Sequence, residues 1–384
     1  MNCWLATGAP GGDYDAISSG NATGSRNDLI TMPATEAFTA GLPVEVGQID
    51  RELKKLWDAS GGVMTRASLI NLAVYSEAPD SLGRNTAIIS QITENHACRA
   101  IVIAADPESK ESGVEAWISA HCHVSQAGRK QVCSEQLSFL LKGKQCGLLP
   151  NIVFAQLDSD LPLYLWWQEE FRPPIDPQLW AWVDRVIYDS QIWRNFGEQM
   201  RLVEATQREA RQRIVLCDLN WERLIHLRIA VAQFFDHPAT HHHLAGIKAL
   251  EIKHAPGFRS TALLFVGWLA GQLGWERSSA KAKSLGFRQK TDDGKQKIKV
   301  SLLRKEGEPI SACRITTESA VFRIEHKPGA DLLDVFFGRT EGRKMRQLLP
   351  AGKNDVVELV QEELMRGGAH QVYLRAVDQV RDLL

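Results

Sequence analysis

Residues 67–104 have the sequence ASLINLAVYSEAPDSLGRNTAIISQITENHACRAIVIA. Segments 67–74 and 99–104 have the apolar composition of strands, and segment 85–97 between them has the length and apolar spacing of a helix. A strand, a helix and a second strand in this order predict a parallel crossover. This stretch therefore predicts an α/β fold class.

The pattern continues on the C-terminal side of this stretch. In residues 114–124 the apolar side chains alternate with polar ones, so one face carries Ala116, Ile118 and Cys122 and the other carries His121 and His123. This pattern predicts a half-buried strand. A short apolar strand at 161–167 and a helix that starts at Pro177 extend the alternation, which predicts an N-terminal α/β domain with a mixed or parallel sheet.

The second half of the chain has a different pattern. Residues 218–236 and 260–275 each predict a long amphipathic helix, and a basic loop follows at 281–295. Strict alternation near Ile298 and closely spaced apolar segments after it predict a mostly antiparallel sheet, closed by helices near residues 356–364 and 373–384. This half is predicted to be an α+β domain.

Residues 1–43 are rich in Gly, Ser, Thr, Asn and Ala. They contain too few large apolar groups to offset the entropy cost of ordering, so they are predicted to form a flexible arm. The ordered fold is expected to begin at the helical stripe that contains Ile49 and Leu53. The predicted division is a 1–43 arm, a 44–215 N-terminal domain and a 216–384 C-terminal domain.

Composition narrows the class of protein. With 384 residues, 44% apolar and 24% charged, the chain has the make-up of two soluble globular domains. Its 46 acidic and 45 basic side chains nearly cancel, so neither nucleic acid nor an anionic membrane is an expected partner. The sequence has no apolar segment of transmembrane length and no secretory signal, so cytoplasmic localisation is expected.

The sequence lacks the common motifs of catalysis and cofactor binding. It has no Walker loop and no nucleophile elbow, and the cluster Gly8, Gly11 and Gly12 lies in the predicted arm without a strand before it. A catalytic triad dispersed in the sequence would escape such a search. We therefore predict a protein that is not an enzyme and that needs no cofactor.

Two groups of histidines could bind a metal. His121 and His123 lie at i and i+2 on one strand face and supply two ligands, so a third would have to come from elsewhere. The alternative is a strand with hydrogen-bonded histidines, and the run from His241 to His243 has the same two interpretations. No metal site is predicted.

Cys122, Cys133 and Cys146 lie within 25 residues of one another. Two of them would form a disulfide if their strands were neighbours and their Cα atoms came within about 7 Å. Separate buried thiols are the alternative.

The chain has eleven Trp, and five of them lie in residues 166–193. Trp166, Trp167, Trp180, Trp182 and Trp193 can fill the core, or one of them can anchor a partner, because Trp is a favoured interface residue. Alternation places Trp166 and Trp167 on opposite strand faces. The basic run from Lys281 to Lys299 is either a solvated loop or a surface that docks an acidic partner.

Several of these segments together resemble the OpcA family of glucose-6-phosphate dehydrogenase assembly proteins. The segments that carry the resemblance are MTRASL at 64–69, His96 with RAIV at 99–102, LPLYLWW at 161–167, DRVIYDS at 184–190, DLNWERL at 218–224 and FVGWLA at 265–270. The resemblance covers about residues 45–384 and leaves out the predicted arm.

The resemblance implies a protein that binds glucose-6-phosphate dehydrogenase of the oxidative pentose phosphate pathway and activates it without catalysing a reaction. It also implies activation linked to thioredoxin through cysteines of the family or its partner. The C-terminal half contains only Cys217 and Cys313, so the candidates for a redox switch are Cys122, Cys133 and Cys146.

We therefore predict an allosteric activator that raises the substrate affinity of the dehydrogenase and contacts it through Trp166, Trp167, Trp180 or Trp182. Two other functions remain open. One is a metal-dependent enzyme that uses His121 and His123. The other is a module that holds a sugar phosphate in the crevice at the strand ends of the α/β domain.

Overall fold

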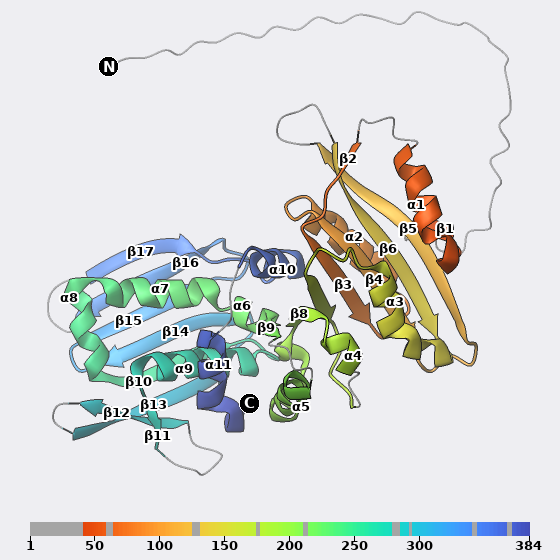
Figure 1. Cartoon of the computed structure of the whole chain (residues 1–384). Helices are drawn as coiled ribbons and strands as arrows, with labels where there is room; N and C mark the ends of the chain where they lie inside the picture. The colour runs from red at the N-terminus through yellow and green to blue at the C-terminus, as the bar shows by residue number, and fades with distance from the viewer. Residues whose placement is uncertain are drawn as a thin grey trace, which may run out of the picture. The chain divides into compact units, whose positions relative to one another are not determined.

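Figure 1 shows the chain as a computed structural model. The structure describes residues 41–58, 64–124, 131–173, 177–209, 214–278, 285–291, 294–339, 344–366 and 371–384. Most of the predicted arm, residues 1–40, lies outside the described residues. Leu42 and Pro43 lie in strand β1 (Leu42–Val44), which pairs with β5 (Gly113–Val124), so the described fold starts slightly before the predicted boundary.

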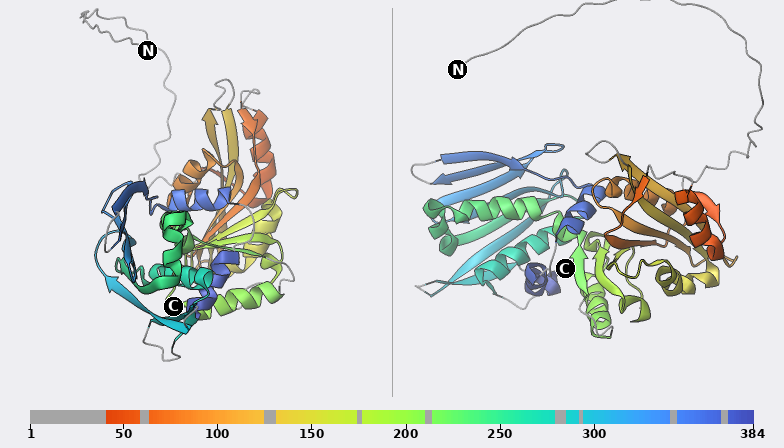
Figure 2. Two further views of the ribbon diagram at one scale, coloured as in Figure 1. Left: turned by 90° about the vertical axis from the view of Figure 1, so that its left-hand side faces the viewer. Right: turned by 45° about the horizontal axis from the view of Figure 1, so that its top comes forward.

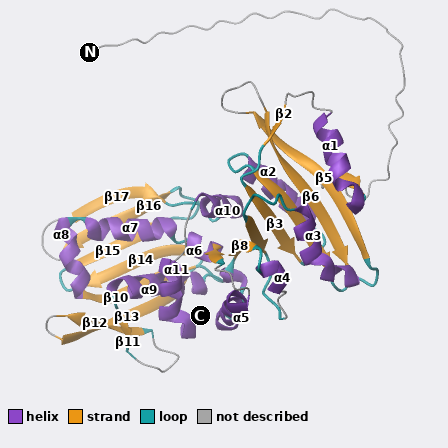
Figure 3. Cartoon of the chain, in the orientation of Figure 1, coloured by secondary structure: helices purple, strands orange, loops and turns teal. Residues whose placement is uncertain are grey.

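The first sheet contains nine strands within the described residues, and six of them form a parallel core. Strands are orange in Figure 3. Their order across the sheet is β6 (Gln131–Lys142), β4 (Cys98–Asp106), β3 (Ile70–Ser76), β7 (Leu163–Trp167), β8 (Val183–Tyr188) and β9 (Val215–Asp218). All neighbours in this row are parallel. With β3 counted as the first strand, the order is 3-2-1-4-5-6, which is the strand order of doubly wound nucleotide-binding folds.

The remaining strands of this sheet extend one edge. β5 pairs antiparallel with β6, and the short β2 (Met64–Arg66) pairs parallel with β6. The predicted alternation in β5 is confirmed, because Ala116 and Ile118 are buried while Glu115 is exposed. In the parallel core, by contrast, residues 98–105 of β4 are all buried, as expected for a strand covered on both faces.

Helices cover both faces of this sheet. α2 (Ser81–Thr93) packs on one face, and the core of the other face contains residues of α1 (Ile49–Asp58), α3 (Leu149–Gln156) and α5 (Phe196–Glu209). The crossover predicted from residues 67–104 is confirmed, because β3, α2 and β4 follow one another and the two strands are parallel. α2 begins and ends four residues before its predicted bounds. α4 (Pro177–Trp180) begins at the predicted proline.

The predicted single helix over residues 218–236 is wrong. Asp218 ends β9 and caps α6 (Leu219–Glu222), and α7 (Ile225–Asp236) starts after a break at Arg223 and Leu224. The break has a physical reason: Leu224 is fully buried and the Arg223 guanidinium pairs with both carboxylate oxygens of Asp189, at 2.8 and 2.7 Å. Tertiary contacts at these two residues therefore override the helical periodicity.

The second sheet has eight strands within the described residues. Their order is β11 (Glu276–Arg277), β12 (Gly286–Thr291), β13 (Gly294–Arg304), β10 (Ile247–His254), β14 (Ile310–Thr317), β15 (Ala320–His326), β16 (Leu332–Arg339) and β17 (Lys344–Pro350). Only the β10–β13 pair is parallel among these described strands, and the others are antiparallel. The predicted fold class is thus confirmed: a mostly parallel sheet comes first and a mostly antiparallel sheet follows.

Two predictions for this half need correction. The basic loop predicted at 281–295 is partly a hairpin, because residues 286–291 and 294–304 form β12 and β13; residues 279–284 lie outside the described residues. The helix predicted at 260–275 exists as α9 (Arg259–Leu273), but it is not amphipathic. It is buried on most sides, because it packs against both the second sheet and α11 (Gln371–Val380).

Short helices complete the structure. They are α8 (Pro238–His241) and the 3-10 turns at Val46–Gln48, Gly143–Leu148, Ser190–Ile192, His242–Gly246 and Arg381–Leu383. The last long element to place is α10 (Val356–Met365), which packs on the first sheet beside α2. The predicted division at residue 215 remains a prediction, although β9 at 215–218 belongs to the first sheet and α10 returns to it.

Candidate partner-binding surface

The first sheet has its change of strand order between β3 and β7. In doubly wound folds this crevice is where a nucleotide binds, with its phosphates on backbone N–H groups after the first strand. Here a carboxylate of the chain itself takes that position. The side chain of Glu169, just after β7, accepts hydrogen bonds from the backbone N–H of Glu77 at 2.9 Å and from the Ser76 hydroxyl at 3.1 Å.

A second internal contact closes the same crevice. Asn85 on α2 and Gln168 exchange two side-chain hydrogen bonds, from Nδ2 of Asn85 to Oε1 of Gln168 at 3.1 Å and back from Nε2 to Oδ1 at 3.0 Å. Asn85 is fully buried. Two donors after the first strand, the Ser76 hydroxyl and the Glu77 N–H, are thus used within the protein. The sequence shows that a glycine-rich loop is absent, but it does not show that the Glu169 carboxylate takes the place of a phosphate.

His121 and His123 lie on the same face of β5, as predicted, but each already has a partner. Nε2 of His121 lies 2.8 Å from Oε1 of Gln136, and Nε2 of His123 lies 3.2 Å from Oγ1 of Thr93. Burial lowers the pKa of His121, which favours the neutral ring. Within the described residues there is no group of three or more His, Cys, Asp or Glu placed to hold a metal.

The run from His241 to His243 has a structural setting. Nδ1 of His241 lies 3.1 Å from the carbonyl oxygen of Phe235, which fixes the turn after α7. His243 is buried against the rings of Phe322 and Phe337, and burial lowers its pKa. These contacts match the interpretation of hydrogen-bonded and core histidines.

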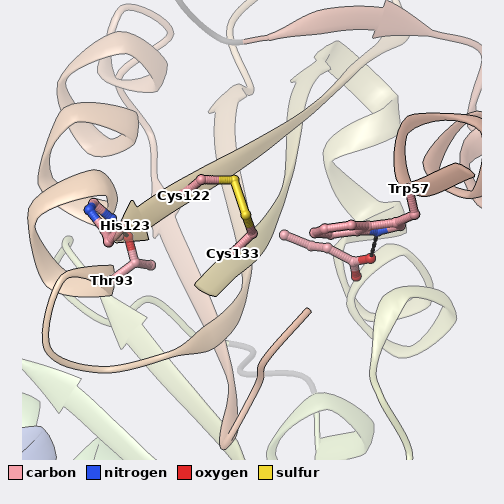
Figure 4. The surroundings of a disulfide bond; sticks show 6 residues. Trp57, Thr93, Cys122, His123 and Cys133 are labelled. Carbon is pink, nitrogen blue, oxygen red and sulfur yellow. Dashed lines mark hydrogen bonds between the residues drawn. A yellow bond between two sulfur atoms is a disulfide. The ribbon is translucent and has the colours of Figure 1, made fainter. Parts of the chain in front are cut away.

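Cys122 and Cys133 form a disulfide between β5 and β6 (Figure 4). They are directly opposed in the strand register, with their Cα atoms 4.1 Å apart. Cys133 is fully buried, whereas Cys122 is half-buried. Cys146 is a free thiol that donates to the carbonyl of Leu141, so the structure joins two of the three redox candidates and leaves the third apart.

An ion cluster around a buried carboxylate lies next to this disulfide and was not predicted. Glu135, two residues beyond Cys133, pairs with Arg99 at 2.7 Å and with Arg66 at 3.2 Å. The indole N–H of Trp57 on α1 donates to the same carboxylate, as Figure 4 shows. The cluster ties α1 to the edge of the first sheet. Polar residues at such strand positions give no pattern from which it could be predicted.

The structure separates the four candidate partner-binding tryptophans. Trp166 and Trp180 are core residues with exposed fractions of 3% and 1%, because the neighbouring helices and strands cover them, so they cannot reach a partner in this structure. Trp167 is half-buried and stacks on Tyr75, with ring centroids 4.2 Å apart. Trp182 is 63% exposed and is the candidate that remains available at the surface.

A buried polar network links the end of β9 to α11. Asp218 is almost completely buried and accepts hydrogen bonds from the backbone N–H and hydroxyl of Ser190, from the N–H of Asn220 and from the hydroxyl of Tyr373. Tyr188 contacts the Tyr373 hydroxyl at 3.0 Å. Burial raises the pKa of Asp218 to about 6. This network is structural, because it has no exposed face.

A pocket lies between α7, strands β14 to β16 and the start of α10. Its charged groups are mostly bound already. Arg223 pairs with Asp189, and Lys353 pairs with Glu358 at 3.0 Å. The pocket therefore offers few unpaired groups to orient a polar ligand.

The described part of the predicted basic run, residues 285–291 and 294–299, lies in the second sheet. Lys281 and Lys283 lie outside the described residues, but the basic side chains of β12 and β13 are exposed.

No helix in the described ranges has the length and apolar character needed to cross a membrane.

Comparison with protein families gives two adjoining matches. Residues 89–205 match a family described as the N-terminal domain of the glucose-6-phosphate dehydrogenase subunit. Residues 214–377 match the family described as the C-terminal domain of the same subunit.

Curated relatives carry the name OxPP cycle protein OpcA. The protein of Nostoc punctiforme is 30% identical over 203 residues, which are 51% of this chain and 42% of the relative. That of Synechococcus elongatus is 26% identical over 279 residues, 67% of this chain and 59% of the relative. The chain thus spans about half the length of the curated relatives it matches.

Solved structures give more distant likenesses. A levoglucosan dehydrogenase in complex with NADH and L-sorbose has 11% sequence identity and a TM-score of 0.46, over 83% of this chain and 96% of that one. A glucose-6-phosphate dehydrogenase in complex with glucose 6-phosphate has 9% identity and a TM-score of 0.41, over 82% of this chain and 86% of that one.

The two adjoining domain matches lie in the family's own order, and the OpcA relatives agree with them. This chain therefore belongs to the OpcA family of glucose-6-phosphate dehydrogenase subunits.

Proposed function

We propose that this chain binds glucose-6-phosphate dehydrogenase and raises its apparent affinity for substrate, with no reaction of its own. The observation that carries the proposal is the match of both domains to the subunit family of that enzyme. A binding protein shifts an enzyme only if it contacts two states of the enzyme differently. The dehydrogenase would thus keep its own active site.

The crevice between β3 and β7 supports the proposal that the chain has no reaction of its own. Glu169 accepts from Ser76 and Glu77 where a phosphate would bind. A sugar phosphate in the same crevice would meet this carboxylate and the closed amide pair of Asn85 and Gln168. The observation therefore favours the activator over the sugar-phosphate module.

The test is the rate of glucose 6-phosphate oxidation by the dehydrogenase of the same organism, measured over a range of substrate concentrations with and without this protein. We expect a lower apparent KM with the protein present and no oxidation by the protein alone. An unchanged KM and kcat at saturating amounts of the protein would contradict the proposal.

Trp182 is the aromatic residue proposed to anchor the dehydrogenase. Its ring is exposed and contacts only Phe154 among the described aromatic rings, at a centroid distance of 5.7 Å. Replacing Trp182 with Ala should weaken binding of the dehydrogenase while thermal unfolding stays nearly unchanged. Trp167→Ala is a poorer test, because Trp167 stacks on Tyr75 and Phe171 within the fold.

A redox link of this activity is proposed at the Cys122–Cys133 disulfide. A dithiol reductant such as thioredoxin would attack the sulfur of half-buried Cys122 and form a mixed disulfide, releasing Cys133 as a thiolate. The second thiol of the reductant would then release Cys122, so that two protein thiols form and the reductant becomes a disulfide.

This link is tested with the paired variant Cys122→Ser and Cys133→Ser. If the disulfide sets the activity, activation by the unsubstituted protein should differ between oxidising and reducing conditions, and activation by the variant should not. The variant should also unfold with about 3 kcal/mol less free energy than the oxidised protein, since a closed loop of this length constrains the unfolded chain. Equal redox dependence in both proteins would exclude this disulfide as the switch.

A further inference from the structure

The second sheet has one covered face and one open face. α7, α8 and α9 lie on the same side of this sheet (Figures 1 and 2), and the core on that side includes Ile298, Val300, Ile315 and Phe322. No described helix covers the other face. Because side chains alternate along a strand, the residues between these core positions belong to the open face.

The open face is strongly basic on one half. Lys297 and Lys299 alternate with Ile298 and Val300 on β13, and Arg314 lies between Cys313 and Ile315 on β14. The exposed basic residues of this half, here called the basic face, are Arg288, Lys290, Lys295, Lys297, Lys299 and Arg314. The whole chain has a net charge of only −1, so positive charge is concentrated here.

The strand register places like charges directly opposite each other. Arg288 on β12 faces Lys297 on β13, and Lys290 faces Lys295. Arg314 on β14 is different, because it lies between Arg323 on β15 and the opposite charge of Glu251 on β10. Like charges in directly opposed positions destabilise a sheet, so these pairs do not arise from the needs of folding. A binding role would account for them.

Little of this charge is neutralised within the protein. Only Lys295 of the basic face has a carboxylate within ion-pair distance among the described residues, Glu276 at 2.6 Å. The pKa of Glu276 is lowered chiefly by Lys295, with Lys290 and Arg288 adding to the effect. On the other half of the open face the charges are paired, Arg346 with Asp334 and Arg323 with Glu325.

The size and chemistry of the open face fit a protein partner. Eight strands at a spacing of about 4.8 Å and seven residues at about 3.4 Å give a face of roughly 800 Å², close to the area that one partner buries in a typical stable complex. Exposed apolar side chains, Leu303, Leu332 and Leu348, lie on the open face with the charged ones.

We propose that the open face of the second sheet docks an acidic surface of glucose-6-phosphate dehydrogenase, with the basic face as the half that selects and orients it. This inference rests on the function proposed above and adds the surface and its charge. A second copy of this chain is a poor occupant, because basic side chains would then meet basic side chains. Complementary charge sets the orientation and the association rate, and the apolar residues add buried area.

The test compares two variants with equal charge change. The face variant is Arg288→Gln, Lys297→Gln and Lys299→Gln. The control variant is Lys54→Gln, Arg84→Gln and Lys110→Gln, three exposed basic residues outside the second sheet that have no ion-pair partner among the described residues. Binding to the dehydrogenase is measured by titration at several salt concentrations, and thermal unfolding is measured for each protein alone.

We expect the face variant to bind about tenfold or more weakly and with a flatter salt dependence, while the control binds like the unsubstituted protein. The face variant should unfold at the same or a higher temperature, because a like-charge pair is removed. Weaker binding together with an equal or higher unfolding temperature distinguishes a lost contact from a damaged fold.

Three outcomes would overturn the proposal. If the unsubstituted protein binds and the face variant binds equally well, the surface is wrong and the proposed function stands. If the unsubstituted protein does not bind the dehydrogenase, both proposals fail together. If heparin or single-stranded DNA binds to the basic face and leaves the complex with the dehydrogenase intact, the face serves a polyanion instead.

Discussion

Asp218 accepts four hydrogen bonds at the buried end of β9, yet burial raises its pKa to about 6 from an ordinary value of 3.8. A carboxyl group whose pKa is raised by folding stabilises the protein while it is protonated. That contribution is complete below about pH 4 and is lost as the pH rises through about 6.

The substitution Asp218→Asn removes this titration and leaves a side chain of nearly the same shape. Relative to this variant, the unsubstituted protein should lose about 2 kcal/mol of unfolding free energy between pH 4 and pH 7. The measurement is denaturant unfolding of both proteins at several pH values. Two stability curves that stay parallel over this range would show that Asp218 is ionised throughout.

Single residues also show what sequence composition cannot settle. Trp166 and Trp182 are the same residue type in neighbouring segments, yet one is in the core and the other is exposed. Alternation places Trp166 and Trp167 on opposite faces of β7, but both faces of a central parallel strand are covered. Which tryptophan remains at the surface depends on the helices packed over the sheet.

Among the helices, α9 and α11 approach each other closely at Gly267. A Cβ atom at this position would clash with the carbonyl oxygen of Ala376 on α11. Such a contact forces the two helix backbones apart, because the nearest atoms belong to the main chain. Glycine at 267 is therefore a packing requirement.

We expect Gly267→Ala to lower the free energy of unfolding by about 3 kcal/mol. The matched control is Gly271→Ala one turn further along, where the nearest atom would be 3.6 Å away. That control should be neutral or stabilising by up to about 1 kcal/mol, because Ala favours a helix. Thermal or urea unfolding measures the stability of both variants. Equal stabilities would argue against the close helix contact.

The broken helix between α6 and α7 shows a second effect of packing on whole elements. Residues 218–236 have the periodicity of one long helix, but Arg223 turns to pair with Asp189 and Leu224 enters the core. Apolar periodicity indicates which side chains are buried, but it does not indicate whether one continuous helix connects them. The same limit led to the prediction of an amphipathic α9, although a partner helix covers its second side.

Across the whole molecule, the C-terminal helix α10 completes the core of the first sheet. Val357, Leu359 and Val360 are buried with Val74 and Ile89, although about 270 or more residues separate them along the chain. Gln361 also donates to the carbonyl of Gln91 near the end of α2. The first sheet thus depends on chain from both halves.

We therefore expect the fragment 44–215 to fail to fold cooperatively on its own, because it lacks α10 and most of β9. The full chain should unfold in one main transition. Near-ultraviolet circular dichroism and thermal unfolding of the fragment and the full chain are the measurements. A fragment with a cooperative transition and native-like tertiary signals would show that the predicted division at residue 215 is a true domain boundary.

Local sequence patterns were enough to predict the class of each half and the family. Apolar periodicity is local, so it predicted the crossover of β3, α2 and β4, the half-buried β5 and the antiparallel strands of the second half. The absence of a glycine-rich phosphate loop is also a local feature, and it can be read from the sequence without knowledge of the fold.

Which residues meet depends on the assembled fold. The filling of the crevice by Glu169, the pairing of Cys122 with Cys133 and the opposed charges of Arg288 and Lys297 all depend on strand order and register. Register is fixed by contacts between segments far apart in the chain, and a shift of one residue would move every side chain to the other face. No local pattern carries that information. The basic run can be read from the sequence, but the open face and its opposed like charges became visible only after the sheet was assembled.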